Sequence, residues 1–422
     1  MATSTTDLSG LFKQAYADDL IDLVPEASIL RKNIDFVSKT EKLGDAYNQP
    51  VIVAQEHGVS YAGPNSGAFT LNPSITMKTQ NAIVGGYQML LRSALDYESA
   101  AKASSSVNAF RDATQLQVEN MLESINKRLE IALLYGQSAT GLGSVASSAN
   151  GDATHTVITF NAGQWASGLW SGTENASIDY LRADGTTKVN TVGALTVVSV
   201  DVTNKKITVS GAAADIAAVD AWIATPHADG VVKFYGASGN EMVGLDKIML
   251  NTGSLFNIDA SVYSLWKANT YAVGGNLTQA IVNKAIGAAQ ARGLAEDVDL
   301  IISPLVWGYL NNDAAANRRY QGDNMTKVDT GAKVIEYHSQ NGVIRIHSHI
   351  FCKEGDGFML PFERAKRIGA QDVSFKIPGS QEGEIFRQLT DQAGFEFRVY
   401  TNQSLIVETP AKCVKLTGIT AS

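Results

Sequence analysis

The feature that most constrains this chain is a long run of apolar residues at helical spacing within residues 107–135. The repeating positions are Val107, Phe110, Thr114, Val118, Met121, Ile125, Leu129 and Ala132. The opposite side of the same stretch is polar, from Arg111 to Glu130. This pattern predicts an amphipathic helix on the protein surface, about 29 residues and about 43 Å long.

Boundary signals agree with that helix. Residues 104–106 are serines that can cap its first turn, and Gly136 follows its last apolar residue. A helix of this length is well over the usual size in globular proteins, which favours a supporting role in a larger structure. An ordinary long helix in an α/β enzyme is the alternative that this feature leaves open.

Composition excludes several other classes of protein. Of the 422 residues, 45% are hydrophobic and 18% are charged, which is enough apolar material for two or three cores. The formal net charge is −8, and no basic run is longer than a pair such as Lys205 and Lys206. A protein that reads nucleic-acid sequence is therefore not expected.

Targeting and redox signals are also weak. The first residues show no signal-peptide pattern, and no apolar stretch reaches the roughly 18 residues that a membrane span needs. Cys352 and Cys413 lie far apart without a partner at metal-binding spacing. We expect both to be reduced packing thiols of a protein made in a cytoplasm.

Residues 46–77 form the second unusual segment, because Glu56 is their only formally charged residue. A strand at residues 50–54, a turn at 63–67 and a return strand at 69–77 predict a long hairpin. A two-stranded ribbon is marginally stable alone, and its uncharged edges can pair with another chain. Either the hairpin packs on its own protein or a neighbouring chain covers it.

A β-rich module is expected between residues 150 and 236. Strands are predicted at residues 154–160, 194–200 and 206–210, with a turn at 201–204. The aromatic residues of this module are Trp165, Trp170, Tyr180 and Trp222. We interpret them as core residues; a carbohydrate-stacking platform is the alternative.

From about residue 237 the pattern alternates between helix and strand, which predicts an α/β domain. Helices are expected at residues 279–293 and from 305 to 311, with a buried strand between them at 298–302. Later strands are expected at residues 343–351, 357–360, 394–400 and 404–408, the last two joined by a turn at 401–403.

His347 and His349 give the clearest metal-binding signal. Alternate residues of a strand project to one face, so the two imidazoles could share an ion. Arg345 is on that same face and opposes a cation, and His338 could join only through folding. We therefore favour a polar strand face or a subunit contact over a metal site.

The acidic clusters are interpreted as solvated or capping groups. They are Asp18 with Asp19, Glu296 and Asp297 with Asp299, and Glu382 with Glu384. The glycines around residues 136–143 follow a helix instead of a strand, and no nucleophile-elbow or phosphate-loop motif occurs. A chain of this size without such signatures is predicted to be a structural protein without a cofactor, and not an enzyme.

The order of these parts resembles the major capsid proteins of tailed bacteriophages, the Hong Kong ninety-seven shell fold. The stretches that carry the resemblance are residues 133–136 closing the long helix, 298–304, 360–362 followed by 367–369, and 391–398. The implied class is α+β. The resemblance covers most of the chain outside the β-rich insertion.

The resemblance implies six parts. They are an N-terminal arm at residues 1–46, an extended hairpin loop at 47–86, a peripheral domain with a long spine helix at 87–150, a β-rich insertion domain at 151–236, an axial α/β domain at 237–365, and peripheral return strands at 366–422. Some relatives crosslink their shells through a lysine of the extended loop. Residues 49–77 contain no lysine, so that chemistry is not expected here.

The resemblance further implies self-assembly as pentamers and hexamers into an icosahedral virion shell that encloses double-stranded DNA without reading its sequence. Scaffolding, portal and decoration proteins are implied partners, and the host bacterial cytoplasm is the implied place of synthesis. The short arm implies a separate scaffolding protein or none. The implied contacts between subunits are Gln55, Glu56, Tyr61, Pro64 and Phe69. The alternatives are an encapsulin-type nanocompartment and a metal-dependent enzyme that uses His347 and His349.

Overall fold

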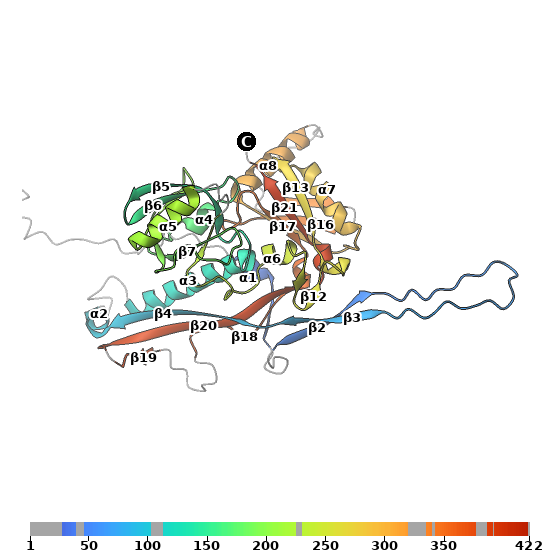
Figure 1. The fold of residues 1–422 in the computed structure, drawn as a ribbon, viewed down its shortest axis with the longest axis horizontal. Coiled ribbons are helices and arrows are strands. Elements are labelled where there is room, and N and C mark those ends of the chain that lie inside the picture. Colours follow the sequence, from blue (N-terminus) through green and yellow to red (C-terminus); the bar gives the residue numbers. More distant parts are fainter. Residues whose placement is uncertain are drawn as a thin grey trace, which may run out of the picture.

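The computed structural model describes residues 28–38, 46–102, 113–224, 230–319, 335–339, 342–376, 386–390 and 392–420. Its class is α+β, as predicted. A long sheet and a helix form the lower layer in Figure 1, a hairpin projects from one end of that layer, and a barrel and a second sheet lie above it.

The lower layer is a five-stranded sheet crossed by the long helix. Its strands are β1 (Phe36–Ser38), β4 (Tyr87–Asp96), β18 (Ala365–Ser374), β19 (Phe386–Gln388) and β20 (Gly394–Val407). The helices of this region are α1 (Ile29–Asn33), α2 (Tyr97–Lys102) and α3 (Ala113–Tyr135). Met121 and Ile125 of α3 pack on Phe397 and Val399 of β20, which buries the apolar stripe against the sheet.

The hairpin consists of β2 (Tyr47–Ala54) and β3 (Lys78–Val84), which pair in antiparallel register from Tyr47 with Val84 to Ala54 with Lys78. Residues 55–77 between them form no strand and run outward as an extended double line in Figure 1. The predicted return strand at 69–77 is wrong, because the paired return lies at 78–84. Within the described residues, Val53 of β2 and Ala82 and Val84 of β3 pack against the rest of the protein.

A closed six-stranded barrel follows the long helix. Its strands are β5 (Gly143–Asp152), β6 (His155–Phe160), β7 (Ser177–Leu181), β8 (Leu195–Asp201), β9 (Lys206–Ser210) and β10 (Val231–Phe234), with helices α4 (Ser167–Trp170) and α5 (Ala213–Ala224). Trp165, Trp170 and Tyr180 are fully buried, which confirms that they are core residues. Trp222 is partly buried and stacks under Arg182.

The upper sheet has six strands in the order β13 (Asn269–Gly275), β21 (Val414–Ile419), β17 (Gly357–Leu360), β14 (Val298–Ile302), β16 (Gly342–Ser348) and β15 (Ile335–Ser339). Its helices are α6 (Leu245–Met249), α7 (Gln279–Gln290) and α8 (Pro304–Arg319), and a small ribbon pairs β11 (Ser254–Leu255) with β12 (Ile258–Asp259). Every residue of β14 is buried, as its apolar sequence predicts.

Two predictions for the C-terminal part are wrong. Residues 401–403 are not a turn, because β20 runs unbroken from Gly394 to Val407. The strand β21 does not join the lower sheet with β18 and β20, because it lies between β13 and β17 of the upper sheet. Among the strands of the upper sheet, β13 and β15 were not predicted.

The last part of the long helix does not lie on the surface, although its pattern predicts a surface helix throughout. Residues 129–136 are buried on all sides, including Glu130 at 0% exposure. The barrel and the upper sheet pack around this end, so its polar groups find partners inside the protein. The predicted start of the helix at Val107, the arm at 1–27, the pair Asp18 and Asp19, and Glu382 with Glu384 lie outside the described residues.

Candidate assembly surface

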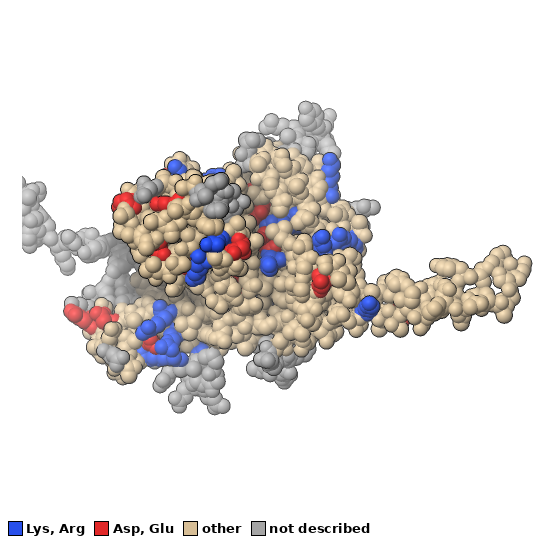
Figure 2. Space-filling view, viewed as in Figure 1, with Lys and Arg blue, Asp and Glu red and all other residues tan. Residues whose placement is uncertain are grey.

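The projecting hairpin exposes large apolar side chains that no described part of the chain covers. The exposed fractions are 88% for Tyr61, 74% for Leu71 and 48% for Phe69. Others on the same hairpin are Ile52, Val59, Ile75, Met77 and Ile83. On the face seen in Figure 2, this arm shows no charged side chain beyond its base, and Glu56 is the one acidic residue of residues 46–77. Exposed apolar surface of this kind marks a site of interaction with another molecule.

All five predicted contact residues lie on this arm. Gln55, Glu56, Tyr61, Pro64 and Phe69 are each exposed. The structure places these residues one after another along the projecting hairpin and does not gather them into one site. Their role as contacts between subunits stays a prediction.

A few hydrogen bonds hold the two arms of the tip together. The amide of His57 donates to the carbonyl of Ile75 over 3.1 Å, and the side-chain amide of Asn72 donates to the carbonyl of Val59 over 2.8 Å. The turn itself uses positive φ angles at Asn65 and Gly67. Most backbone groups of residues 55–77 therefore have no ladder partner within the described chain.

The base of the hairpin is anchored, in contrast to its tip. Val53, Ala82 and Val84 are buried in a cluster with Trp266 and Ile406. The amide of Ile83 also donates to the carbonyl of Phe256 over 3.0 Å. These contacts at the base therefore fix the direction in which the hairpin leaves the rest of the protein.

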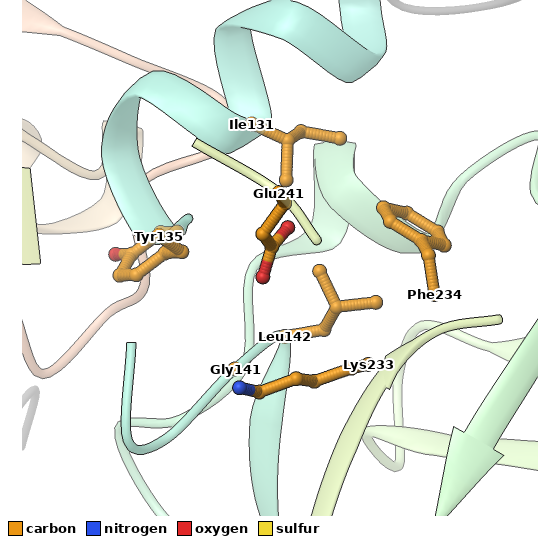
Figure 3. Close-up of a pocket in the computed structure, with 7 residues that line it drawn as sticks. All are labelled: Ile131, Tyr135, Gly141, Leu142, Lys233, Phe234 and Glu241. Atoms are coloured by element: carbon orange, nitrogen blue, oxygen red, sulfur yellow. The ribbon is translucent and has the colours of Figure 1, made fainter. Parts of the chain in front are cut away.

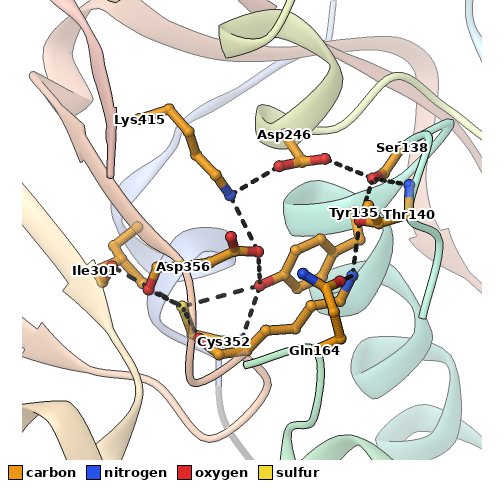
Figure 4. A network of polar contacts seen from close by, with 10 residues as sticks. Tyr135, Ser138, Thr140, Gln164, Asp246, Ile301, Cys352, Asp356 and Lys415 are labelled. Atoms are coloured by element: carbon orange, nitrogen blue, oxygen red, sulfur yellow. Dashed lines mark hydrogen bonds and ion pairs between the residues drawn. The ribbon is translucent and has the colours of Figure 1, made fainter. Parts of the chain in front are cut away.

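A buried polar network lies where the long helix, the barrel and the upper sheet meet, and we call it the junction (Figure 4). Lys415 Nζ lies 2.7 Å from Asp246 Oδ1 and 3.1 Å from Asp356 Oδ2. The other oxygen of Asp246 accepts the hydroxyl of Ser138, and Asp356 accepts the hydroxyl of Tyr135. The network therefore links β21 to α6 and to the end of α3.

Lys353 completes the junction. Its Nζ donates to Thr140 Oγ1 over 2.9 Å and to Gln164 Oε1 over 3.2 Å, and it lies over the ring of Tyr135. Burial lowers the pKa of Lys353 to about 8. Since Gln164 belongs to the barrel, this lysine ties the barrel to the segment before β17.

Opposite charges settle the protonation of the other junction groups. Burial alone would lower the pKa of Lys415, but Asp246 and Asp356 outweigh it and raise that pKa. Burial would raise the pKa of Asp246, yet Lys415 and Lys353 bring it below its usual value. Burial also raises the pKa of Cys352 to about 12, so this thiol is unreactive at neutral pH.

A second buried carboxylate joins the N-terminal segment to the long helix. Glu130 accepts the backbone amides of Leu30 over 2.7 Å and Arg31 over 3.1 Å. His349 Nε2 lies 2.9 Å from the same carboxylate. Arg367 holds the segment from the other side by donating to the carbonyl of Ile34 over 3.0 Å.

The two histidines of the predicted metal signal do not come together. His349 lies beyond the end of β16 and pairs with Glu130, whereas His347 lies 2.7 Å from Asp299. His338 lies in β15, opposite Val343. Within the described ranges, no three metal-binding side chains gather in one place.

The remaining acidic cluster is held by ion pairs. Glu296 contacts Arg364 at 2.7 Å and Lys412 at 2.6 Å, and Asp297 contacts Arg345 at 2.7 Å. Burial opposes ionisation of Glu296, but its hydrogen bonds, that from Lys412 foremost, lower its pKa to about 2. These carboxylates are therefore held by structural ion pairs. Cys352 and Cys413 are free thiols, and both are buried.

A small pocket at the foot of α3 holds Glu241 beside Lys233 (Figure 3). Its volume is about 10 Å³, which is room for roughly one water molecule. The backbone amide of Gln137 donates to Glu241 over 3.0 Å. Burial raises the pKa of Glu241 to about 7. The pocket is too small for an organic substrate.

Sequence reasoning missed the junction. Its members lie far apart in the chain, and Ser138 and Asp246 alone are separated by 108 positions. One signal was present: Lys415 stands between Val414 and Leu416 in an apolar strand, and a lysine at a buried strand position requires a partner. Nothing in the sequence identifies that partner.

Comparison with known proteins rests on structure alone, because no family model and no curated protein matches this sequence. The chain is similar to the capsid asymmetric unit of cyanophage A-1(L), with a TM-score of 0.59 and 12% identity, over 99% of this chain and 100% of that one. It is also similar to the capsid of an empty GTA particle, with a TM-score of 0.50 and 7% identity over the whole of both chains.

A weaker likeness is to an encapsulin complex of Synechococcus elongatus, with a TM-score of 0.44 and 8% identity, over 100% of this chain and 97% of that one. The stronger matches show that this chain has the fold of tailed-phage major capsid proteins, as its sequence predicted. Among the described helices, none has the length and apolarity to cross a membrane.

Proposed function

We propose that this protein is a major capsid protein whose copies assemble as pentamers and hexamers into the icosahedral shell around the double-stranded DNA of a tailed phage. The carrying observation is the hairpin, which exposes Tyr61, Leu71 and other large apolar groups beyond the reach of its own core. In the proposal it lies across an adjacent subunit through contacts that include Gln55, Glu56, Pro64 and Phe69.

Energetics support this role. Full burial of one large apolar side chain stabilises an assembly by about 1.5–3 kcal/mol, and identical subunits repeat each contact by symmetry. The hairpin carries only Glu56 as a formal charge between residues 46 and 77, so covering it removes few charges from water. The six-part division belongs to this proposal with two changes, because β5 pairs within the barrel and β21 pairs within the upper sheet.

The proposal assigns no catalytic role and no cofactor. It is supported by the partners of the candidate groups, since His347 and His349 each lie against a separate carboxylate. Scaffolding and portal proteins, and a decoration protein on the outer surface, are the partners it expects. The site of synthesis would be the host cytoplasm, and the final location the virion.

Sedimentation velocity and negative-stain microscopy of the purified chain test the proposal. Capsomers or closed shells are expected, alone or with a scaffolding protein. A chain that stays monomeric under all assembly conditions, scaffold included, would contradict it. Shells that hold a protein cargo and no DNA in cells would instead favour the encapsulin alternative.

A further inference from the structure

Two side chains of the junction have the parts of an amide bond. The Nζ atom of Lys415, in β21, lies 2.7 Å from one carboxylate oxygen of Asp246, in α6. Lys415 is 1% exposed and Asp246 is 2% exposed. Within the described residues, this nitrogen has no partner at the angles of a hydrogen bond. The amine and the carboxyl group are therefore in close contact without being a well-aligned hydrogen-bonded pair.

The surroundings of the pair disfavour its charges. Lys415 Nζ lies 3.7 Å from the ring centre of Phe358 and 5.9 Å from that of Tyr135. Burying an ammonium and a carboxylate costs free energy, and their attraction offsets this cost only when further hydrogen bonds are well formed. Conversion of the pair to an amide removes both charges from the interior. A site without access to solvent also excludes the water that would hydrolyse the amide.

Two neighbouring groups suit the chemistry of amide formation, and Figure 4 shows both beside the pair. Asp356 Oδ2 lies 3.1 Å from Lys415 Nζ, so it can take up a proton from the ammonium. The hydroxyl of Ser138 donates to Asp246 Oδ2, the carboxylate oxygen that does not face the lysine. A donor at that oxygen stabilises the negative charge that develops on it when the carboxyl carbon is attacked.

We propose that Lys415 and Asp246 form an isopeptide bond within one subunit after the chain has folded. The ammonium of Lys415 gives a proton to Asp356, and the free amine attacks the Cγ atom of Asp246. The new C–N bond replaces the bond from Cγ to Oδ1. That oxygen leaves as water, with the proton held by Asp356 and a second proton from the nitrogen. The ammonium and the carboxylate supply every atom, so no further reactant is needed.

The rest of the junction is compatible with this step. Folding holds the amine against the carboxyl group, which replaces a bimolecular encounter with a reaction between positioned groups. The bond removes one charge of each sign, and Lys353 and Asp356 remain as a second pair of opposite charges. It would tie β21 covalently to α6. The inference concerns the single subunit and does not depend on the proposed function.

Tryptic digestion of the folded and then denatured chain tests the inference. Trypsin does not cleave after an acylated lysine, so residues 413–422 should remain one peptide. This peptide should be linked to the one that contains Asp246. Mass spectrometry should find the linked pair at the sum of the two peptide masses less one water molecule. The peptide that ends at Lys415 should be nearly absent.

Two variants sharpen the test. Asp356→Asn keeps the shape of the side chain but cannot carry the proton, so the linked pair should accumulate at least about tenfold more slowly. Lys205→Arg is the matched control, because Lys205 also contacts a carboxylate, that of Glu354, but is 38% exposed. This variant should give the linked pair at the same rate as the unmodified chain.

Only separate peptides from the folded, unmodified chain would overturn the inference, and so would a link from Lys415 to another residue. An unchanged rate in Asp356→Asn would overturn the role given to Asp356. The first measurement needs no variant, so it decides the matter even if a variant does not fold. Shell formation is measured separately, which keeps a failure of this inference distinct from a failure of the proposed function.

Discussion

The projecting hairpin and the buried junction distribute polar and apolar groups in opposite ways. The junction places Lys415, Lys353, Asp246 and Asp356 at the centre of the molecule, and each is at most 6% exposed. The hairpin places Tyr61 and its apolar neighbours at the far end of the molecule, in water. The usual arrangement of a globular protein is reversed in both regions.

The difference shows which interactions the single chain completes. In the junction, two lysines face two aspartates, so the buried charges balance within one subunit. On the hairpin beyond its base, large apolar side chains stay exposed and few backbone groups have hydrogen-bond partners within the described chain. We infer that the junction stabilises the subunit, whereas the hairpin serves the assembly.

Deleting residues 55–70 should separate the two roles most clearly. None of these residues is buried, so thermal unfolding of the subunit should remain nearly unchanged. Shell formation should be lost, as seen by sedimentation and microscopy. Val192→Ser is the control, because it removes an apolar group with 67% exposure from the barrel. Normal shells from the deletion variant would refute the role of the hairpin.

Lys415→Met should have the largest effect on the subunit itself. Removing one partner of a buried ion pair leaves Asp246 and Asp356 without their cation, which costs about 3–5 kcal/mol. Urea unfolding would measure the loss. Arg345→Met breaks an exposed pair, with side chains 41% and 44% exposed, and should cost only about 0–1 kcal/mol. Similar losses for the two variants would contradict the special position of the junction.

Glu130→Ala should release the N-terminal segment. The amides of Leu30 and Arg31 would lose their acceptor, at a cost of about 1–3 kcal/mol. Trypsin should then cleave faster after Arg31 and Lys32. Glu130→Gln keeps an acceptor oxygen and should give a smaller acceleration. Unchanged cleavage in the alanine variant would mean that other contacts hold the segment.

Glu241→Gln should produce the smallest change, visible only as a function of pH. Burial raises the pKa of Glu241 from 4.5 to about 7, so the folded state binds a proton more tightly than the unfolded one. The resulting stability is complete below about pH 4.5 and is lost as the pH rises through 7.

Glutamine does not titrate, so the variant should gain about 1–2 kcal/mol over the unmodified chain between about pH 5 and pH 6.5. Urea unfolding across that range would detect it. The exposed Glu363→Gln serves as the control. Parallel pH profiles for the unmodified chain and Glu241→Gln would show that Glu241 does not contribute to the pH dependence of stability.

Regular elements with a clear period were predictable from the sequence. Strands β6, β9 and β14 lie within one residue of their predicted bounds, because alternation or a continuous apolar run fixes them locally. The turn predicted at residues 401–403 is absent for a specific reason. Thr401 and Gln403 are 1% and 2% exposed, and Gln403 donates to Thr401 over 2.6 Å. Polar residues that satisfy each other in a sheet resemble a turn in sequence.

The candidate site was predictable only in part. The missing charges of residues 46–77 left open whether the hairpin packs on its own protein or is covered by a neighbour, and the structure shows a projecting hairpin with exposed apolar side chains. The structure also has a cleft of about 1020 Å³ beside β4, lined by α3, residues 88–91 of β4 and the barrel segments 172–177 and 234–237. The sequence could not predict this cleft, because its walls come from separate parts of the chain. The polar side of α3 was misjudged for the same reason: its surroundings come from distant parts of the chain.

The place of β21 sets an order of events during synthesis. This strand lies inside the upper sheet, between β13 and β17, although every other described strand precedes it in the chain. Lys415, which neutralises the junction, is part of it. A nascent chain therefore cannot complete its upper sheet until residues 414–419 have left the ribosome. Until then its buried aspartates also lack the charge of Lys415. Incomplete translation products should lack a stable subunit and be excluded from growing shells.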